Sequence, residues 1–124
     1  MSIRWYTLLE LPTVSDERGS LTVLENMLPF SISRLFWIYG ADGKIRGGHR
    51  HHVTRQALIA ISGKVTVFLD NGKVHSTINL DNPRLCLLVE PEDWHTMTFS
   101  QDSILLVVAS HPYDRNDYIE QRYE

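Results

Sequence analysis

The amino-acid sequence predicts an all-β fold, a jelly roll or closed barrel followed by a short C-terminal helix. Eight short runs rich in β-branched and aromatic residues follow one another along the chain. Clusters of Gly, Asp, Asn and Pro separate these runs, and no helical periodicity precedes residue 110. So many short strands in 124 residues favour a jelly roll or barrel, because both arrangements remove or shield exposed strand edges.

The expected strands are apolar runs bounded by turn residues. In order along the chain they cover residues 21–24, 34–39, 56–61, 65–69, 74–78, 84–89, 96–99 and 103–109. Asn71-Gly72 separates two of them and predicts a two-residue hairpin with a type I′ turn, in which both central residues have positive φ. This hairpin indicates an antiparallel sheet.

The expected helix covers residues 114–123. Asp114 can cap its N-terminus, and apolar or aromatic residues between Tyr118 and Tyr123 recur at helical spacing. No internal repeat or linker interrupts the chain, so residues 1–124 are expected to form a single domain.

Composition excludes several classes of function. A hydrophobic fraction of 43% is enough for one core. The net charge of −3, with scattered basic residues, gives no electrostatic case for binding nucleic acid or an anionic membrane. The longest apolar stretches, such as 104–109, are too short to span a bilayer, and a cytoplasmic location is expected. The single cysteine, Cys86, lies among leucines and is expected to be a buried, inert thiol.

A histidine pair is the main chemical feature of the sequence. In an extended segment His49 and His51 lie two residues apart and point to the same face, so both imidazoles share one pocket. Together with Gly48 and Gly63 they form the outline of the first cupin motif, in which a glutamate completes a metal site. Gln56 stands at the position of that glutamate, and an amide is a poor replacement for a carboxylate. The pair is therefore expected to move protons without a metal.

The other histidines are weighed one by one. His95 occupies the region of the second cupin motif, where a structural role and a functional role are about equally expected. His75 and His111 are expected at the surface or in loops. His52 is expected to face away from the histidine pair unless the strand is bulged there.

Motifs along almost the whole chain resemble the nucleotide-sugar 3,4-ketoisomerases, which are small cupins. The matching segments, in order, are Asp16-Glu-Arg-Gly-Ser-Leu, Leu28-Pro-Phe-Ser-Ile-x-Arg34, Gly48-His-x-His51, Gln56-x-Leu, Asp81-x-Pro83, Pro91-x-x-Trp-His95-x-Met97 and Val108-Ala-Ser-x-x-Tyr113-Asp-x-x-Asp-Tyr-Ile119. Motifs in this order are far more specific than His-x-His alone. Arg55 departs from the family pattern, where an acidic residue precedes the glutamine, and His52 is a second departure.

The resemblance implies a fold, a reaction and a partner. The fold would be a metal-free cupin jelly roll, usually an intertwined homodimer, with the histidine pair inside the barrel. The reaction would move the keto group of dTDP-4-oxo-6-deoxyglucose, or a related nucleotide sugar, from carbon 4 to carbon 3. The product would lead to 3-amino-3,6-dideoxy sugars. Apolar side chains of Trp5, Tyr6 and Leu8 are available for a homodimer contact.

The residues can be assigned to this chemistry. A neutral imidazole accepts and returns a proton at neutral pH, so moving the carbonyl through an enediolate needs no redox cofactor. His51 is favoured as the base and His49 as its partner, although spacing alone does not order them. Arg18 is expected to bind the diphosphate or polarise the sugar carbonyl, and Gln56 and His95 to contact substrate. A solvated Arg18 paired with Asp16 or Glu17 is an equal alternative.

Two other hypotheses remain open at this point. One is a metal-dependent cupin enzyme that uses His49, His51 and His95 with a further ligand. The other is a sugar-binding cupin without activity, because a fold does not fix a function.

Overall fold

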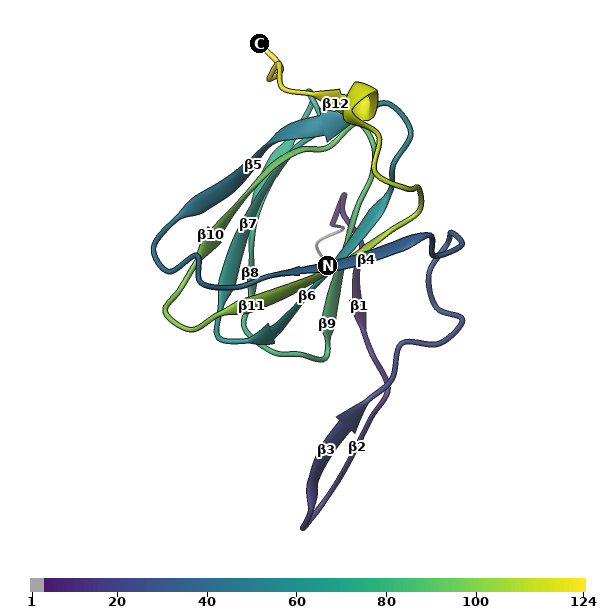
Figure 1. Ribbon diagram of the computed structural model, residues 1–124, viewed down its shortest axis with the longest axis vertical. Helices are drawn as coiled ribbons and strands as arrows, with labels where there is room; N and C mark the ends of the chain where they lie inside the picture. The colour runs from purple at the N-terminus through teal and green to yellow at the C-terminus, as the bar shows by residue number, and fades with distance from the viewer. Residues whose placement is uncertain (1–3) are drawn as a thin grey trace.

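The protein forms two facing antiparallel β-sheets, shown in Figure 1 for the computed structural model, which describes residues 4–124. The strands are β1 (Leu8–Glu10), β2 (Thr13–Asp16), β3 (Gly19–Thr22), β4 (Arg34–Ile38), β5 (Ile45–His51), β6 (Gln56–Ser62), β7 (Val65–Asp70), β8 (His75–Leu80), β9 (Leu85–Val89), β10 (Trp94–Phe99), β11 (Ile104–Ala109) and β12 (Tyr118–Ile119). One sheet has the order β1-β9-β6-β11-β4 and the other β12-β5-β10-β7-β8, while β2 and β3 form a separate hairpin. This confirms the expected all-β jelly roll.

The core fills the space between the two sheets. Its buried side chains come from both sheets and include Leu58, Leu87, Leu105, Val67, Leu69, Leu80 and Phe99. A second cluster lies on the outer face of the first sheet, where Ile59, Cys86 and Leu88 pack beneath partly buried side chains such as Met27 and Phe30. Strands β6, β9 and β11 are therefore covered on both faces, which explains why their sequences are continuously apolar rather than alternating.

The thiol of Cys86 is fully buried in this second cluster. Burial raises its pKa to about 11, so the thiol stays protonated, in agreement with the inert thiol expected from its neighbours.

The β7–β8 hairpin is present, but its turn differs from the predicted one. Asp70 pairs with His75, so four residues connect the strands instead of two, and only Gly72 has a positive φ, of 91°. The side chain of Asn71 explains the difference, because its Oδ1 accepts hydrogen bonds from the backbone N–H groups of Lys73 and Val74, each at 2.9 Å. The prediction of a type I′ turn was therefore wrong, although the hairpin itself is confirmed.

The predicted C-terminal helix is reduced to one 3₁₀ turn at Arg115–Asp117. Asp114 caps this turn as expected, with its side chain accepting a hydrogen bond from the backbone N–H of Asn116. The chain then becomes extended, and β12 pairs with the end of β5, with Tyr118 opposite His51. Pairing with this exposed strand edge outweighs the weak helical pattern of the segment.

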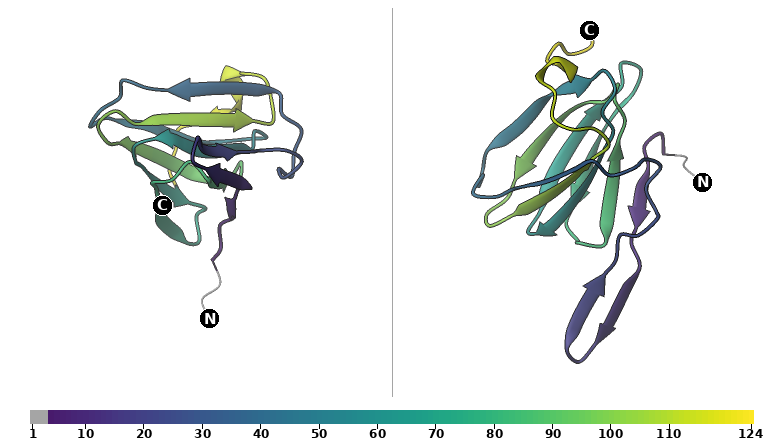
Figure 2. Two further views of the ribbon diagram at one scale, coloured as in Figure 1. Left: turned by 90° about the horizontal axis from the view of Figure 1, so that it is seen from below. Right: turned by 45° about the vertical axis from the view of Figure 1, so that its right-hand side comes forward.

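The β2–β3 hairpin projects away from the barrel (Figures 1 and 2). Val14 and Leu21, which pair across it, are 68% and 60% exposed. By contrast, Trp5, Tyr6 and Leu8, which were expected to be free for a dimer contact, are partly buried against the core of their own barrel. Among residues 4–124, no helix is long and apolar enough to cross a membrane.

Candidate active site

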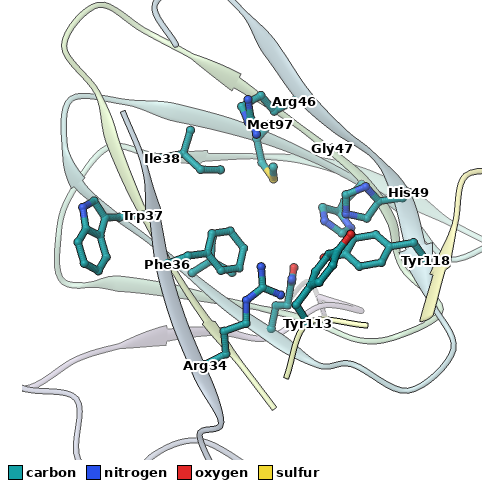
Figure 3. Close-up of a pocket in the computed structure, with 13 residues that line it drawn as sticks. Arg34, Phe36, Trp37, Ile38, Arg46, Gly47, His49, Met97, Tyr113 and Tyr118 are labelled. Atoms are coloured by element: carbon teal, nitrogen blue, oxygen red, sulfur yellow. The ribbon is translucent and has the colours of Figure 1, made fainter. Parts of the chain in front are cut away.

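A cavity of about 380 Å³ opens between the two sheets (Figure 3). Its walls combine imidazole, phenol, guanidinium and apolar side chains: Arg34, Phe36, Trp37, Ile38, Arg46, Gly47, His49, Gln56, His95, Met97, Val107, Tyr113 and Tyr118. In Figure 3, His49 and Tyr118 lie together at one end, while Arg46 and Met97 lie at another. A space of this size, with a few converging polar groups, is typical of a small-molecule site.

A glycine bulge in β5 precedes His49, which lines this cavity. His49 pairs with His95 on β10, but Thr96 pairs with Gly47, so Gly48 is an extra residue in β5. Gly47 and Gly48 have φ values of 89° and 80°, which residues with a side chain rarely adopt. A Cβ atom on Gly47 would also lie only 2.8 Å from the carbonyl oxygen of His95. The bulge therefore requires glycine, and it re-directs the strand just before the reactive residues.

Three imidazoles meet at one end of the cavity. The ring centroids of His49 and His51 are 5.1 Å apart, and those of His49 and His95 are 5.0 Å apart. The sequence predicted that the first two share a face, and the structure places them side by side. His49 and His95 are among the residues that line the cavity, whereas His51 is buried and is not among them. The ring of Tyr118 packs against His49 and His51 with centroid distances of 4.7 Å each.

Burial keeps all three imidazoles neutral at physiological pH. Desolvation lowers the pKa of His49, and lowers that of His51 to about 4, with the neighbouring His49 adding to the effect. Desolvation also lowers the pKa of His95 to about 3. The Nδ1 atom of His95 lies 3.0 Å from the carbonyl oxygen of Asp93, which can only accept a hydrogen bond. Nδ1 therefore carries the proton of the neutral ring, and Nε2 keeps a free lone pair.

His51 is held by its surroundings without a hydrogen bond of its own. Neither of its ring nitrogens has a hydrogen-bond partner among residues 4–124. A buried polar group in this condition costs stability, and such groups concentrate at functional sites. The backbone that follows it is tied down by Asp117, whose carboxylate accepts hydrogen bonds from the N–H groups of His52 and Val53 at 3.1 and 2.8 Å and from the hydroxyl of Thr54.

The residues after the histidine pair separate into inward and outward positions. Gln56 is 4% exposed and lines the cavity, as expected for a substrate contact. Arg55 is directed elsewhere, because its Nε and Nη2 atoms donate to the carboxylate of Glu90 at 2.8 Å each and its Nη1 atom donates to the carbonyl oxygen of Pro29. The departure from the family pattern at Arg55 is thus accommodated by an ion pair outside the cavity. His52 is exposed after the end of β5 and does not join the cluster.

Arg18 does not reach the cavity of its own chain. It lies at the tip of the β2–β3 hairpin, where its Nη2 atom is 2.6 Å from a carboxylate oxygen of Asp16 and its side chain is 84% exposed. His75 and His111 are exposed, as expected.

Four polar residues of the cavity were not predicted from the sequence. Arg34, Arg46, Tyr113 and Tyr118 all line it, but Tyr118 was expected in a helix and the other three had no role. Arg34 could have been found from the period of β4, because Arg34, Phe36 and Ile38 alternate with the exposed Leu35 and Trp37. Tyr113 lies in an irregular segment and Tyr118 in the two-residue strand β12, and neither has a comparable period in its surrounding sequence.

Among the residues that the structure describes, no group of three or more His, Cys, Asp or Glu side chains has the geometry of a metal site. The cavity lies in a cupin-like barrel, and imidazole, phenol and guanidinium groups face a space of small-molecule size.

The chain belongs to a known family. Residues 4–124 match the family model FdtA, described as WxcM-like, C-terminal, which confirms the resemblance drawn from the motifs. A curated relative from Aneurinibacillus thermoaerophilus, TDP-4-oxo-6-deoxy-alpha-D-glucose-3,4-oxoisomerase, is 41% identical over 112 residues, which cover 87% of this chain and 81% of the relative.

Solved structures agree with this assignment. The TDP-quinovose 3,4-ketoisomerase WlaRB from Campylobacter jejuni is 36% identical, with a TM-score of 0.90 over 96% of this chain and 95% of that chain. The 3,4-ketoisomerase QdtA from Thermoanaerobacterium thermosaccharolyticum, solved as a His-to-Asn mutant in complex with TDP-4-keto-6-deoxyglucose, is 31% identical. Its TM-score is 0.90, over 97% of this chain and 90% of that chain.

Proposed function

We propose that this protein is a nucleotide-sugar 3,4-ketoisomerase that converts dTDP-4-oxo-6-deoxyglucose to its 3-oxo isomer. The observation that carries the proposal is the cluster of neutral imidazoles at one end of a cavity of about 380 Å³. The names of the relatives support the substrate class, since they act on or bind TDP-linked keto sugars. The buried single thiol also suits the reducing conditions of the cytoplasm, where we propose that the enzyme acts.

The reaction requires two proton transfers at carbon and one between oxygens. A base removes the proton from carbon 3, which the neighbouring carbonyl acidifies, and an enediolate forms. A proton then adds to carbon 4, and the hydroxyl proton at carbon 3 is transferred to the oxygen at carbon 4. Net atoms and electrons are unchanged, so His-mediated acid–base catalysis meets the chemical requirement.

The geometry gives a reason to order the two histidines. His49 lines the cavity, whereas His51 is buried and does not line it, so His49 is the imidazole that a sugar carbon can approach. We therefore propose His49 as the base and His51 as its partner in proton relay, the reverse of the order favoured from sequence. Gln56 and His95 line the same space and are proposed to contact the sugar.

The projecting hairpin supports a homodimer. An isolated two-stranded hairpin is marginally stable in water, and β2–β3 exposes Val14 and Leu21 to solvent. If a second copy of the chain covers these side chains, the tip of this hairpin, which carries Arg18, lies against that second copy. We propose that Arg18 contributes to substrate binding in the partner's cavity, which would explain why it lies outside its own.

The direct test is incubation of the purified protein with dTDP-4-oxo-6-deoxyglucose, followed by product analysis by NMR. The 3-oxo isomer should form, with deuterium at carbon 4 when the reaction runs in D₂O. His49→Asn and His51→Asn should each lower turnover by at least about 10²-fold while the fold persists, because the amide cannot take up a proton. Near-normal turnover in both variants would refute the proposed roles of the pair.

The dimer has its own test. Sedimentation at micromolar concentration should give the mass of two chains. Arg18→Ala and His49→Asn chains, each inactive alone, are then mixed so that about half of the dimers contain one chain of each kind. In each mixed dimer, one of the two sites would combine an intact Arg18 with an intact His49. Activity should therefore return in about a quarter of all sites. A monomeric mass, or no recovery on mixing, would count against the arm exchange.

A further inference from the structure

The cavity contains an arginine without a protein partner. Arg34 is the first residue of β4, its side chain is partly buried, and its guanidinium makes no ion pair or hydrogen bond with residues 4–124. Its central carbon instead lies 4.5 Å from the ring centroid of Phe36 and 5.2 Å from that of Tyr113. Arg18, Arg55 and Arg122 each have a carboxylate partner, whereas Arg34 has none among the described residues. A partly desolvated cation held only by aromatic rings has unused capacity to bind an anion.

Arg34 lines the same cavity as His49 and His95. Its charge contributes to the lowered pKa of His51, after burial and the neighbouring His49, while Asp117 opposes the lowering. The ring of His95 stacks beside that of His51, with a centroid distance of 6.0 Å. Tyr118 is packed against the ring of His51. Figure 3 shows the Arg34 side chain extending into the cavity beside Tyr113, on the opposite wall from His49.

A second arginine, Arg46, lines another part of the cavity. Arg46 is exposed, it also has no ion pair among the described residues, and it lies near Met97 at a different end of the cavity from Tyr118. A nucleotide sugar presents two separate requirements for positive charge: the diphosphate, which is charged throughout, and the enediolate oxygen, which becomes negative only during the reaction. Two arginines at different places in the cavity, neither with an ion pair among the described residues, match these two requirements.

We propose that Arg34 is a catalytic residue that donates hydrogen bonds to the enediolate oxyanion, and that Arg46 binds the diphosphate. This inference rests on the proposed ketoisomerase function. The base at His49 and the cation at Arg34 then face the sugar from opposite walls. The guanidinium stabilises the negative charge that forms on oxygen when the proton leaves carbon 3, and it releases that charge when carbon 4 is protonated.

The test compares Arg34→Gln, Arg34→Lys and Arg46→Gln with Arg84→Gln as a matched control. Arg84 is exposed and bonds only to Asn82, so its replacement should leave all parameters unchanged. For each variant, kcat and KM are measured with dTDP-4-oxo-6-deoxyglucose, and the dissociation constant of TDP is measured by calorimetry. Thermal unfolding confirms that each variant is folded.

Arg34→Gln should lower kcat by about 10²-fold or more while TDP binding stays within about threefold of wild type. Arg34→Lys should recover part of the loss, because it restores the charge without the forked geometry. Arg46→Gln should weaken TDP binding by about tenfold or more with a smaller effect on kcat.

Other outcomes would overturn the assignment. A loss of TDP affinity in Arg34→Gln at unchanged kcat would make Arg34 the diphosphate ligand, and wild-type kinetics in this variant would remove it from the site. Failure of the wild-type protein to isomerise the substrate would refute the proposed function instead, so the two failures are distinguishable.

Discussion

Acid should destabilise the native protein through its buried imidazoles. The folded-state pKa values of His51 and His95 are about 4 and about 3, against an ordinary value of 6.5 for histidine. Because both are depressed, their stabilising contribution is complete above pH 6.5 and is lost as the pH falls toward these values. Asp93 acts in the opposite sense: burial raises its pKa from 3.8 to about 6, so its contribution is present below pH 3.8 and is lost as the pH rises through 6.

The net effect between pH 6 and pH 4 follows from proton counting. The unfolded state holds up to two more protons on the two imidazoles, while the native state holds up to one more on Asp93. The difference of about one proton corresponds to a slope of about 1.4 kcal/mol per pH unit, or about 3 kcal/mol over the window. Since domains unfold with only about 5–15 kcal/mol, a loss of this size is readily measured.

Two substitutions separate the contributions. His95→Gln removes one titrating imidazole but keeps an N–H donor for the carbonyl of Asp93, so the slope should fall by about 1.4 kcal/mol per pH unit. Asp93→Asn should steepen the slope by a similar amount. Urea unfolding at fixed protein concentration, followed by tryptophan fluorescence from pH 7 to pH 4, measures both. A His95→Gln slope equal to that of wild type would refute the assignment of a neutral, buried His95.

Three further predictions test other parts of the structure. Gly47→Ala should cost about 2 kcal/mol or more of stability and most of the activity, because the new Cβ would meet backbone at 2.8 Å with φ at +89°, and wild-type stability in urea unfolding would contradict the bulge. Arg55→Ala should lose at most about 1 kcal/mol while kcat stays within about twofold, since its ion pair lies outside the cavity; a large fall in kcat would place it in the site. EDTA should leave isomerase activity unchanged, because Gln56 supplies no anionic ligand, whereas a loss restored by zinc, iron or manganese would indicate a metal enzyme.

The sequence predicted the elements whose signals are local. Strands such as β6, β7 and β11 were found within one or two residues, because continuous or alternating apolar runs depend only on which faces are buried. Strands β1, β2, β5 and β12 were missed. β1, β2 and β12 have only two to four residues each, and β1 and β12 pair with strands distant in sequence. β5 carries Gly47 and Gly48 and has no apolar run that would mark it as a strand. The predicted C-terminal helix is only a 3₁₀ turn in the structure, because Tyr118 pairs instead with His51. This pairing with a residue distant in sequence cannot be read from residues 114–123.

The residues of the site also differ in whether the local sequence reveals their position. The common face of His49 and His51 follows from the two-residue period of a strand, and the structure places the two rings 5.1 Å apart. Arg34 has no local signal of proximity to them, because β4 belongs to one sheet and β5 to the other. Only the three-dimensional arrangement of the two sheets brings its guanidinium to the cavity that they share.

The strand order of the first sheet has a consequence for folding kinetics. In the order β1-β9-β6-β11-β4, no two neighbouring strands are consecutive in the sequence, so every pairing in this sheet closes a long loop. Such high contact order slows folding, to the range of milliseconds to seconds typical of all-β domains. The β7–β8 hairpin is local and can form early, but β4 is in place only after it pairs with β11, about 70 residues away. During refolding, isomerase activity should therefore return last, after most of the secondary structure, because the two walls of the cavity meet only when the slowest pairing is complete.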